Sequence, residues 1–394
     1  MNDVDGVCVK QGSGNWWYVG TGFALGSLYL LIVFVGAELW PRTDKPLKLI
    51  AHSLKLEESA LACGPSADSR NVVEENRFFI FGGNSPRFFE VEIFDPPVDD
   101  QTALYLGPIV DRIELLICGK DGEVISRQFL GSQFSESQLQ HPFPRTVFRL
   151  TTAEASARLL LKVDQDASAS VPIVAEPISN YLAGFSQRSQ IQTLLYGMVS
   201  MMVIYNITLS FLLRNRVFLF NALISGSMLA LDAAVSGFGL LYLWPQWPKV
   251  QDAFLVISMA GPVLFGPLFC WSFLSIGKAK ELDNAVIYKP WGGLGVVCIL
   301  SWVLGAPEWL ATGALAIFWL TMALIILVDL FRRALWEANE RAAVILAPLL
   351  GGVFPPMFLG ITREYLGWEY GAFAVHHTQM ALVLEAALFT LAVA

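Results

Sequence analysis

Charged side chains are scarce in this chain. Only 15% of its 394 residues are Asp, Glu, Lys or Arg, whereas 55% are hydrophobic and the mean hydropathy is +0.53. A soluble globular domain rarely has such a composition. Residues 41–188 hold more than half of the ionisable side chains, and residues 189–394 are apolar blocks separated by short charged stretches. The chain is therefore expected to have two parts that face two different solvents.

The sequence also lacks the residue patterns that catalysis usually requires. It contains no metal-ligand cluster, no catalytic-triad pattern and no glycine-rich phosphate loop. We therefore assign no catalytic residue and expect the chain not to be an enzyme. We also expect no cofactor, no metal site and no nucleic acid partner.

Long apolar runs, in contrast, are abundant. A run of about 18 or more apolar residues is long enough to span a bilayer as a helix. One such run extends from Trp16 to Leu39, and seven more follow a long polar interval. The seven runs cover residues 191–213, 217–243, 253–276, 286–305, 309–331, 342–361 and 373–394. The sequence therefore predicts a seven-helix membrane bundle whose partner is the lipid bilayer.

Lys and Arg residues cluster in alternate connections between the seven runs, and the intervening connections carry only Lys249 and Arg363. Cationic loops are retained on the cytoplasmic side of a membrane, so these connections should face the cytoplasm. The residues concerned are Arg214, Arg216, Lys278, Lys280, Arg332, Arg333 and Arg341. The triplet Arg214-Asn215-Arg216 is expected to form a tight hairpin connection. The polar interval 41–188 must then lie on the other side of the membrane.

The first apolar run has two interpretations. Val35-Gly36-Ala37 resembles the small-residue cleavage site of a signal peptide, whereas the length of the run fits an uncleaved anchor. We favour the anchor. The predicted organisation is a signal anchor or signal peptide at 1–40, an exported β-sandwich domain at 41–185 and the seven-helix bundle at 186–394.

The exported interval has the pattern of β structure. Alternating or continuous apolar stretches of strand length occur at 87–95, 112–119, 123–131, 146–151 and 157–166. The sequence GKDG at 119–122 is a hairpin turn signal. Short strands separated by frequent turns predict a sandwich or jelly roll. Pro172 and Pro177 are expected to stiffen the approach to the membrane, and the first bundle helix should begin close after them.

The membrane half contains several recognisable motifs: YGM…YN in the first bundle helix, a short basic turn followed by FLFNAL, GFGLLYLWP closing the second run, and LVLEAALFTLAVA at 382–394. Together they resemble a known family, the bacterial seven-transmembrane receptors with diverse intracellular signalling modules. The exported stretches RIELLICGKDGEVISRQFLGS and RLLLKVDQDASASVPIVAEP are similar to the family's second type of extracellular domain, a jelly roll. The resemblance covers about residues 70–394.

The resemblance implies a sensory receptor in the inner membrane of a bacterium. Its β domain would lie in the periplasm and bind a ligand or a periplasmic protein. Seven helices would relay the signal to a cytoplasmic output module such as a diguanylate cyclase or histidine kinase. No such module follows in this sequence, and we expect it to lie beyond Ala394; a separate protein that reads the signal is the alternative. A homodimer would suit such an output.

Three intramembrane polar residues are candidates for helix coupling: Asn206, Asp232 and Glu385. Polar groups inside a membrane are costly and often functional, although helix association alone is the alternative role. Asp329, near the inner boundary, is expected to pair with Arg332 or Arg333. In the exported domain Cys63 and Cys118 are candidates for a disulfide, with a free buried thiol at Cys118 as the alternative.

Candidate ligand contacts are Arg87, Phe89, Tyr105, Arg112 and Arg127. The arginines suit an anionic ligand, although they fit a solvated sheet face equally well. The aromatic residues suit a carbohydrate-like ligand, but phenylalanines in alternating strands are usually core residues. The absence of tryptophan between Pro41 and Leu194 weakens the carbohydrate interpretation.

A membrane transporter of a small solute is the alternative function. Transporters often contain broken helices near the middle of the membrane, and the Gly- and Pro-interrupted stretches 261–267 and 348–356 fit that pattern. The two halves of the bundle show no other matching pattern, so these stretches are expected to kink receptor helices instead. A retinal protein fits least well, because the last run has no lysine for a Schiff base.

Overall fold

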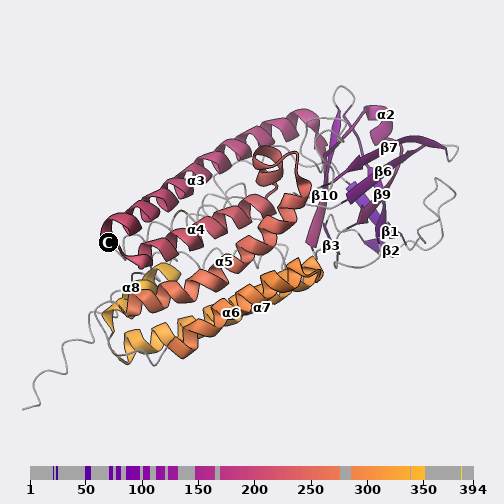
Figure 1. Cartoon of the computed structure of the whole chain (residues 1–394). Coiled ribbons are helices and arrows are strands. Elements are labelled where there is room, and N and C mark those ends of the chain that lie inside the picture. Colours follow the sequence, from indigo (N-terminus) through magenta and orange to yellow (C-terminus); the bar gives the residue numbers. More distant parts are fainter. Residues whose placement is uncertain are drawn as a thin grey trace, which may run out of the picture. The chain divides into compact units, whose positions relative to one another are not determined.

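The chain folds into two compact units, drawn in Figure 1. One comprises Thr43–Ser189 with Ala233–Leu255, and the other comprises Met1–Arg42, Gln190–Asp232 and Val256–Ala394. The computed structural model describes residues 21, 24, 49–54, 71–73, 77–80, 86–97, 101–106, 112–119, 123–131, 147–164, 169–275, 285–337, 339–350 and 383. The first unit is built on β strands and the second on apolar helices.

Two antiparallel sheets form the β part of the first unit. The strands are β1 (Leu49–Leu54), β2 (Asn71–Val73), β3 (Arg77–Ile80), β4 (Arg87–Ile93), β5 (Thr102–Leu106), β6 (Arg112–Cys118), β7 (Val124–Leu130), β8 (Val147–Leu150), β9 (Arg158–Asp164) and β10 (Ala169–Pro177). The six-stranded sheet has the order β2-β1-β4-β9-β6-β7, and the four-stranded sheet has the order β3-β10-β5-β8. A short helix, α2 (Thr152–Ala155), separates β8 from β9 and begins with a capping box made by Thr151 and Glu154.

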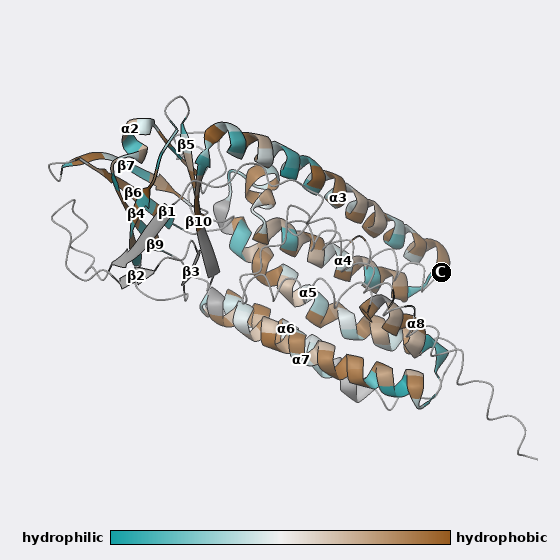
Figure 2. Ribbon diagram, turned by 180° about the vertical axis from the view of Figure 1, so that it is seen from behind, coloured by the Kyte–Doolittle hydropathy of each residue, from teal (hydrophilic) through white to brown (hydrophobic). Residues whose placement is uncertain are grey.

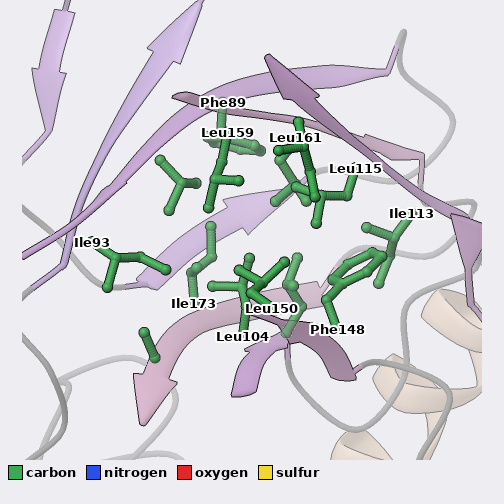
Figure 3. Packing of buried hydrophobic residues seen from close by; sticks show 14 of the residues in the cluster. Phe89, Ile93, Leu104, Ile113, Leu115, Phe148, Leu150, Leu159, Leu161 and Ile173 are labelled. Carbon is green, nitrogen blue, oxygen red and sulfur yellow. The ribbon is translucent and has the colours of Figure 1, made fainter. Parts of the chain in front are cut away.

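One apolar core lies between the two sheets, as Figure 3 shows. Side chains on alternate positions of a strand point to the same face, so every second residue enters this core. Val91 pairs with Leu159 across β4 and β9, and Leu115 pairs with Leu161 across β6 and β9. The four-stranded sheet contributes Leu104, Leu106, Phe148, Leu150, Ile173 and Ala175. The two sheets therefore form a β-sandwich.

The five predicted strands correspond to β4, β6, β7, β8 and β9 and are confirmed. β6 and β7 pair as a hairpin, closed by a bond from the Gly119 N–H to the Glu123 carbonyl at 2.8 Å. Pro172 and Pro177 both belong to strand β10, and Pro177 directly precedes helix α3. That they stiffen the approach to the membrane stays a prediction. Each proline still lies in a register pair with the neighbouring strand, Pro172 with Arg77 of β3 and Pro177 with Thr102 of β5.

Six described helices follow the sandwich. They are α3 (Ile178–Leu213), α4 (Arg216–Val235), α5 (Pro248–Leu274), α6 (Ala285–Val303), α7 (Glu308–Leu335) and α8 (Glu340–Pro348). Among the described residues, four helical stretches are long and apolar enough to cross a membrane: Ile178–Leu213, Arg216–Val235, Val250–Leu274 and Leu310–Leu335. Figure 2 colours most of α6 and α7 as hydrophobic. The first apolar run, 16–39, and the last, 373–394, lie almost wholly outside the described residues.

The α3–α4 connection is the tight hairpin that the sequence predicted. Only Arg214 and Asn215 separate the two helices, and Arg214 adopts a left-handed conformation with φ of 51°. The Asn215 side chain accepts a hydrogen bond from the Val217 N–H at 3.0 Å and so caps α4. The predicted second run, 217–243, is in contrast not one helix. α4 ends at Val235, Gly237 adopts a φ of 77°, and a separate π-helical turn, η3, covers Gly239–Leu243.

Helix α5 continues through Pro262 and Pro267 as one element. The break that the transporter alternative expects at 261–267 is therefore not present in this helix. Gly261 lets α4 approach closely, because a Cβ added there would lie 2.0 Å from Oγ of Ser227.

Candidate functional site

Strand β10 leads directly into helix α3, because Pro177 ends the strand and Ile178 begins the helix. The Ile178 N–H donates to the carbonyl of Gln101, the residue before β5, at 2.7 Å. The helix start is thereby bonded to the sheet it leaves.

The first turns of α3 pack on the four-stranded sheet. Ile178 and Tyr181 form an apolar cluster with Ala103 of β5 and Val147 of β8, and Tyr105 and Phe185 pack against it. In β5, Ala103 and Tyr105 alternate with the core residues Leu104 and Leu106, so this cluster lies on the sheet face opposite the core.

Three aromatic rings run from the sheet along the helix. The ring centroids of Tyr105 and Tyr181 are 6.0 Å apart and tilted, and those of Tyr181 and Phe185 are 6.0 Å apart and nearly parallel. Such pairs add to the free energy gained by burying the rings. Tyr105, a candidate ligand contact, therefore contacts the first membrane helix.

Glu176 and Arg188 add charge to this junction. Glu176 is the penultimate residue of β10, and its pKa is raised because its carboxyl group is half-buried, an effect that the positive charge of Arg188 partly offsets. The guanidinium of Arg188 lies along α3 over Gly184, where an added Cβ would be 3.5 Å from Nη2. A basic side chain on α3 thus acts on a carboxyl group of the sheet.

The α4–α5 connection reaches the same helix. The hydroxyl groups of Ser189 on α3 and Tyr242 in η3 are 2.9 Å apart and hydrogen-bonded. Sequence analysis missed this contact, since both residues occur in polar or interfacial stretches with no periodic signal.

Trp244 closes this connection. Its indole N–H donates to Oε1 of Gln251 at 2.9 Å, and Nε2 of Gln251 donates to the carbonyl of Ala234. The ring stacks on Phe254 with centroids 4.5 Å apart. Gly239 lies against the indole, and a Cβ there would be 2.0 Å from a ring carbon. The motif GFGLLYLWP therefore forms one tightly packed turn in the α4–α5 connection.

Asp232, predicted as an intramembrane polar residue, is buried on α4 and accepts a hydrogen bond from the Tyr196 hydroxyl on α3. Gln192, one turn earlier on α3, donates to the Tyr196 oxygen at 3.0 Å. The prediction did not identify Tyr196 as the partner, although it lies in the quoted motif YGM.

Asn206 is fully buried on α3. Its amide donates to the carbonyl of Met202 at 2.9 Å, and its carbonyl accepts from Asn221 of α4 at 3.4 Å. The α3–α4 pair is therefore joined by two buried polar contacts. Glu385, the third predicted intramembrane residue, lies outside the described residues.

The end of α7 holds the ion pairs that were expected. Asp329 accepts from Nε of Arg333 at 2.8 Å and from Nη2 of Arg332 at 3.2 Å. The backbone N–H of Asn339, which caps α8, donates to the Arg333 carbonyl at 2.9 Å. The connection between α7 and α8 is thus fixed by charge and by backbone bonds.

The candidate ligand residues do not gather at one place. Arg87 and Arg112 are exposed at the starts of β4 and β6. Arg127 on β7 pairs with the buried Glu114 of β6 and lies over its neighbour Phe129.

Two further predicted residues have structural roles. Phe89 is only 3% exposed within the sandwich core, in agreement with the expectation that strand phenylalanines are core residues, so its ring is not available to a ligand. Cys118 is disulfide-bonded, so the free-thiol alternative does not apply to it. Cys63 lies outside the described residues, and its pairing with Cys118 stays a prediction. Among the described residues, no group of three or more His, Cys, Asp and Glu side chains could hold a metal ion.

Comparison with known proteins agrees with this arrangement of apolar helices. A family model described as 7TM diverse intracellular signalling matches residues 188–394, more than half of the 394 residues. The match begins within α3 and includes the buried contacts of Tyr196 and Asn206. No curated protein matches the chain. The chain is a multi-pass membrane protein and belongs to the 7TM diverse intracellular signalling family, as its motifs suggested.

Proposed function

We propose that this protein is a sensory receptor of the bacterial inner membrane. The β-sandwich, a jelly roll of the family's second type, lies in the periplasm and detects a ligand or a protein partner. The helices relay the signal to a cytoplasmic output module such as a diguanylate cyclase or histidine kinase. The ligand is carbohydrate-like or anionic and meets the exposed arginines Arg87 and Arg112.

The contact of Ile178, Tyr181 and Phe185 with the sheet carries this proposal. A change of the sandwich that moves β5 or β10 also moves the first turns of α3, because these residues share one apolar cluster and one backbone bond. Packed interfaces change between discrete arrangements, so a small ligand-induced shift can bias the helix between two states. The buried contacts from α3 to Asp232 and Asn221 would pass this bias to α4.

Two charge patterns support the orientation. The basic residues of the α3–α4 and α7–α8 connections suit the cytoplasmic side.

A receptor with this order of domains would act as a homodimer, in which a shift of one helix alters the distance between two output modules.

The test compares alanine substitutions at two adjacent residues of α3 in the full-length protein, expressed in its own cell with an output reporter. Tyr181→Ala should reduce the range between resting and stimulated output, because it removes the ring that joins the sheet to α3. Leu182→Ala is the matched control, since Leu182 is the next residue and is 40% exposed. Deletion of residues 41–180 should abolish the response altogether. An unchanged level and unchanged response after that deletion would refute the coupling.

A further inference from the structure

Glu176 lies in a cross-strand row on the sheet face opposite the sandwich core. In the register of the four-stranded sheet, Glu176 of β10 pairs with Ala103 of β5, and Ala103 pairs with Arg149 of β8. Ile173 and Ala175, which alternate with Glu176 along β10, are core residues. The carboxyl group therefore belongs to the face on which the first turns of α3 pack.

An apolar contact borders this carboxyl group. Ala103, its register partner, is fully buried in one cluster with Tyr181 of α3 and Val147 of β8. Glu176 itself is half-buried. Ionisation of a half-buried carboxyl group costs free energy, because the charge loses part of its hydration. The close packing of α3 and the charge on Glu176 therefore oppose each other.

Described side chains from three elements share this face with Glu176. Arg188 and Tyr181 come from α3, and both interact electrostatically with the carboxyl group. Tyr105 comes from β5 and Arg149 from β8, whereas β3 pairs with an earlier part of β10. Arginine keeps its charge and tyrosine stays neutral between acid and neutral pH. Within this set of described side chains, Glu176 alone changes its charge in that range.

Helix α3 is longer than a bilayer is thick. Its 36 residues extend about 54 Å, whereas about 20 helical residues span the hydrocarbon core. The apolar run at 191–213 accounts for that span, so residues 178–190 are left outside it, on the side of the sandwich. Glu176 and Arg188 are therefore within reach of protons in the surrounding solution.

We propose that protonation of Glu176 is a switch that sets how closely the first turns of α3 pack on the four-stranded sheet, so that acid outside the inner membrane biases the receptor. This inference rests on the proposed function, in which the start of α3 carries the signal. The neutral carboxyl group fits the close arrangement, whereas the ionised group favours a looser arrangement in which water reaches it.

The direction of the switch follows from linkage between protonation and packing. Burial raises the pKa of Glu176 in the close arrangement, and a looser arrangement returns this pKa towards its ordinary value. Stabilisation of the close arrangement is therefore fully present below the ordinary pKa of a glutamate, and it is lost as the pH rises through the raised pKa. Each unit of difference between the two pKa values changes the ratio of the arrangements about tenfold.

Arg188 sets the pH at which the switch acts. Its positive charge favours the ionised carboxylate and so lowers the pKa that burial raises. Removal of this charge should move the midpoint to higher pH, and a lysine in its place should move the midpoint back. Such a response distinguishes a switch between the sheet and α3 from the titration of a carboxyl group that only faces water.

Hydrogen exchange of the full chain in nanodiscs tests the switch. The amide groups of residues 178–187 report on the packing of α3, since the Ile178 N–H is bonded to the Gln101 carbonyl. At about pH 7.5 they should exchange several times more slowly in Glu176→Gln than in the unmodified chain, because glutamine stays neutral, and at about pH 4 the two proteins should agree. Glu92→Gln, at an exposed position of β4, should match the unmodified chain at both pH values. Equal exchange of Glu176→Gln and the unmodified chain at both pH values overturns the proposal.

A titration of the same exchange difference measures the midpoint. Each Arg188 variant is compared with its own Glu176→Gln double variant at every pH, so that the chemical exchange rate cancels. Arg188→Gln should shift the midpoint to higher pH, and Arg188→Lys should restore it. Arg112→Gln removes the same charge from the exposed start of β6, in the other sheet, and should leave the midpoint unchanged. A midpoint that ignores Arg188→Gln, or that moves equally with Arg112→Gln, overturns the role of Arg188.

An output reporter in the protein's own cell tests the consequence for signalling. The output of the unmodified chain should change between an external pH of about 5 and about 7.5, whereas Glu176→Gln should keep the acid level at both. If exchange follows Glu176 and output depends on residues 41–180 but not on external pH, acid is not a stimulus, and this inference fails while the receptor function stands. If exchange follows Glu176 but output ignores residues 41–180, the proposed function fails and the packing switch stands alone.

Discussion

The Tyr196 hydroxyl on α3 donates a hydrogen bond to Oδ2 of Asp232 on α4, and Gln192 donates to the same tyrosine oxygen at 3.0 Å. Tyr196 and Asp232 are 7% and 8% exposed, so water cannot easily replace the tyrosine. A buried carboxyl group that loses a donor keeps its desolvation cost. This contact should therefore fix the packing of α3 on α4.

Replacement Tyr196→Phe tests the contact with the ring retained. The variant should lose about 1–3 kcal/mol of unfolding free energy, because Asp232 and Gln192 both lose a partner. Thermal unfolding in detergent should show a midpoint several degrees lower. Tyr205→Phe on the same helix is the control, since Tyr205 is 52% exposed. Equal midpoints for the two variants would contradict the role of Tyr196.

The second α3–α4 contact should be weaker. The bond from Asn221 to Asn206 is 3.4 Å long, and the buried Oδ1 of Asn221 has no hydrogen-bond partner among the described residues. Interhelical polar contacts in membranes average about 0.6 kcal/mol in double-mutant cycles. The cycle Asn206→Leu, Asn221→Leu and the double variant should give a coupling energy of that size. A coupling above about 2 kcal/mol would mean that the pair is much stronger than its geometry indicates.

The raised pKa of Glu176 gives the sandwich junction a pH dependence. Burial raises the pKa of this carboxyl group in the folded chain, so folding favours its protonated form. This contribution to the free energy of unfolding is fully present below the ordinary pKa of a glutamate, and it is lost as the pH rises through the raised pKa. Acidification should therefore stabilise the junction relative to neutral pH.

Replacement Glu176→Gln should flatten this dependence. Thermal unfolding of the full chain between about pH 4 and pH 8 measures the slope for both proteins. Glu92→Gln is the control, because Glu92 is exposed on β4. If Glu176→Gln retains the slope of the unmodified chain, another group is responsible.

The sequence predicted the elements whose signal is local. Five strands with clear alternation, the Arg214-Asn215 turn and the start of α3 near residue 180 are confirmed, because periodicity, turn residues and long apolar runs determine them. The family was also recognisable from its motifs, and the family model that matches residues 188–394 confirms it.

The remaining features depend on contacts between segments that are distant in the sequence. Nothing local shows that Pro172 belongs to a paired strand, because its register is set by β3. The break after Val235 arises from Gly237 and from Trp244, which packs on Gly239. Tyr196 was overlooked because a tyrosine near a membrane boundary is common, and only the position of Asp232 one helix away gives it a role.

The close approach of Gly239 and Trp244 leads to a further prediction. Gly239→Ala should destabilise the α4–α5 connection by about 1–3 kcal/mol, because the added methyl group displaces the indole from Gln251. Gly313→Ala in α7 should be neutral or stabilising, since among the described residues no atom outside the adjoining part of its own helix lies within 4 Å of its added Cβ, and alanine favours helices. Tryptophan fluorescence during thermal unfolding measures both. Comparable midpoints for the two variants would show that Trp244 can move at no cost.

The orientation of the chain can be tested with two single cysteines. Val124 on β7 is 50% exposed and Trp336 at the end of α7 is 83% exposed, so a thiol at either position should be reachable by solvent. In intact cells with a permeable outer membrane, a membrane-impermeant maleimide should label Val124→Cys and spare Trp336→Cys. Lysis should make both variants react equally, because the inner membrane then no longer keeps the reagent away from position 336. The opposite pattern in intact cells would reverse the topology inferred from Arg332 and Arg333, and with it the location of the sandwich.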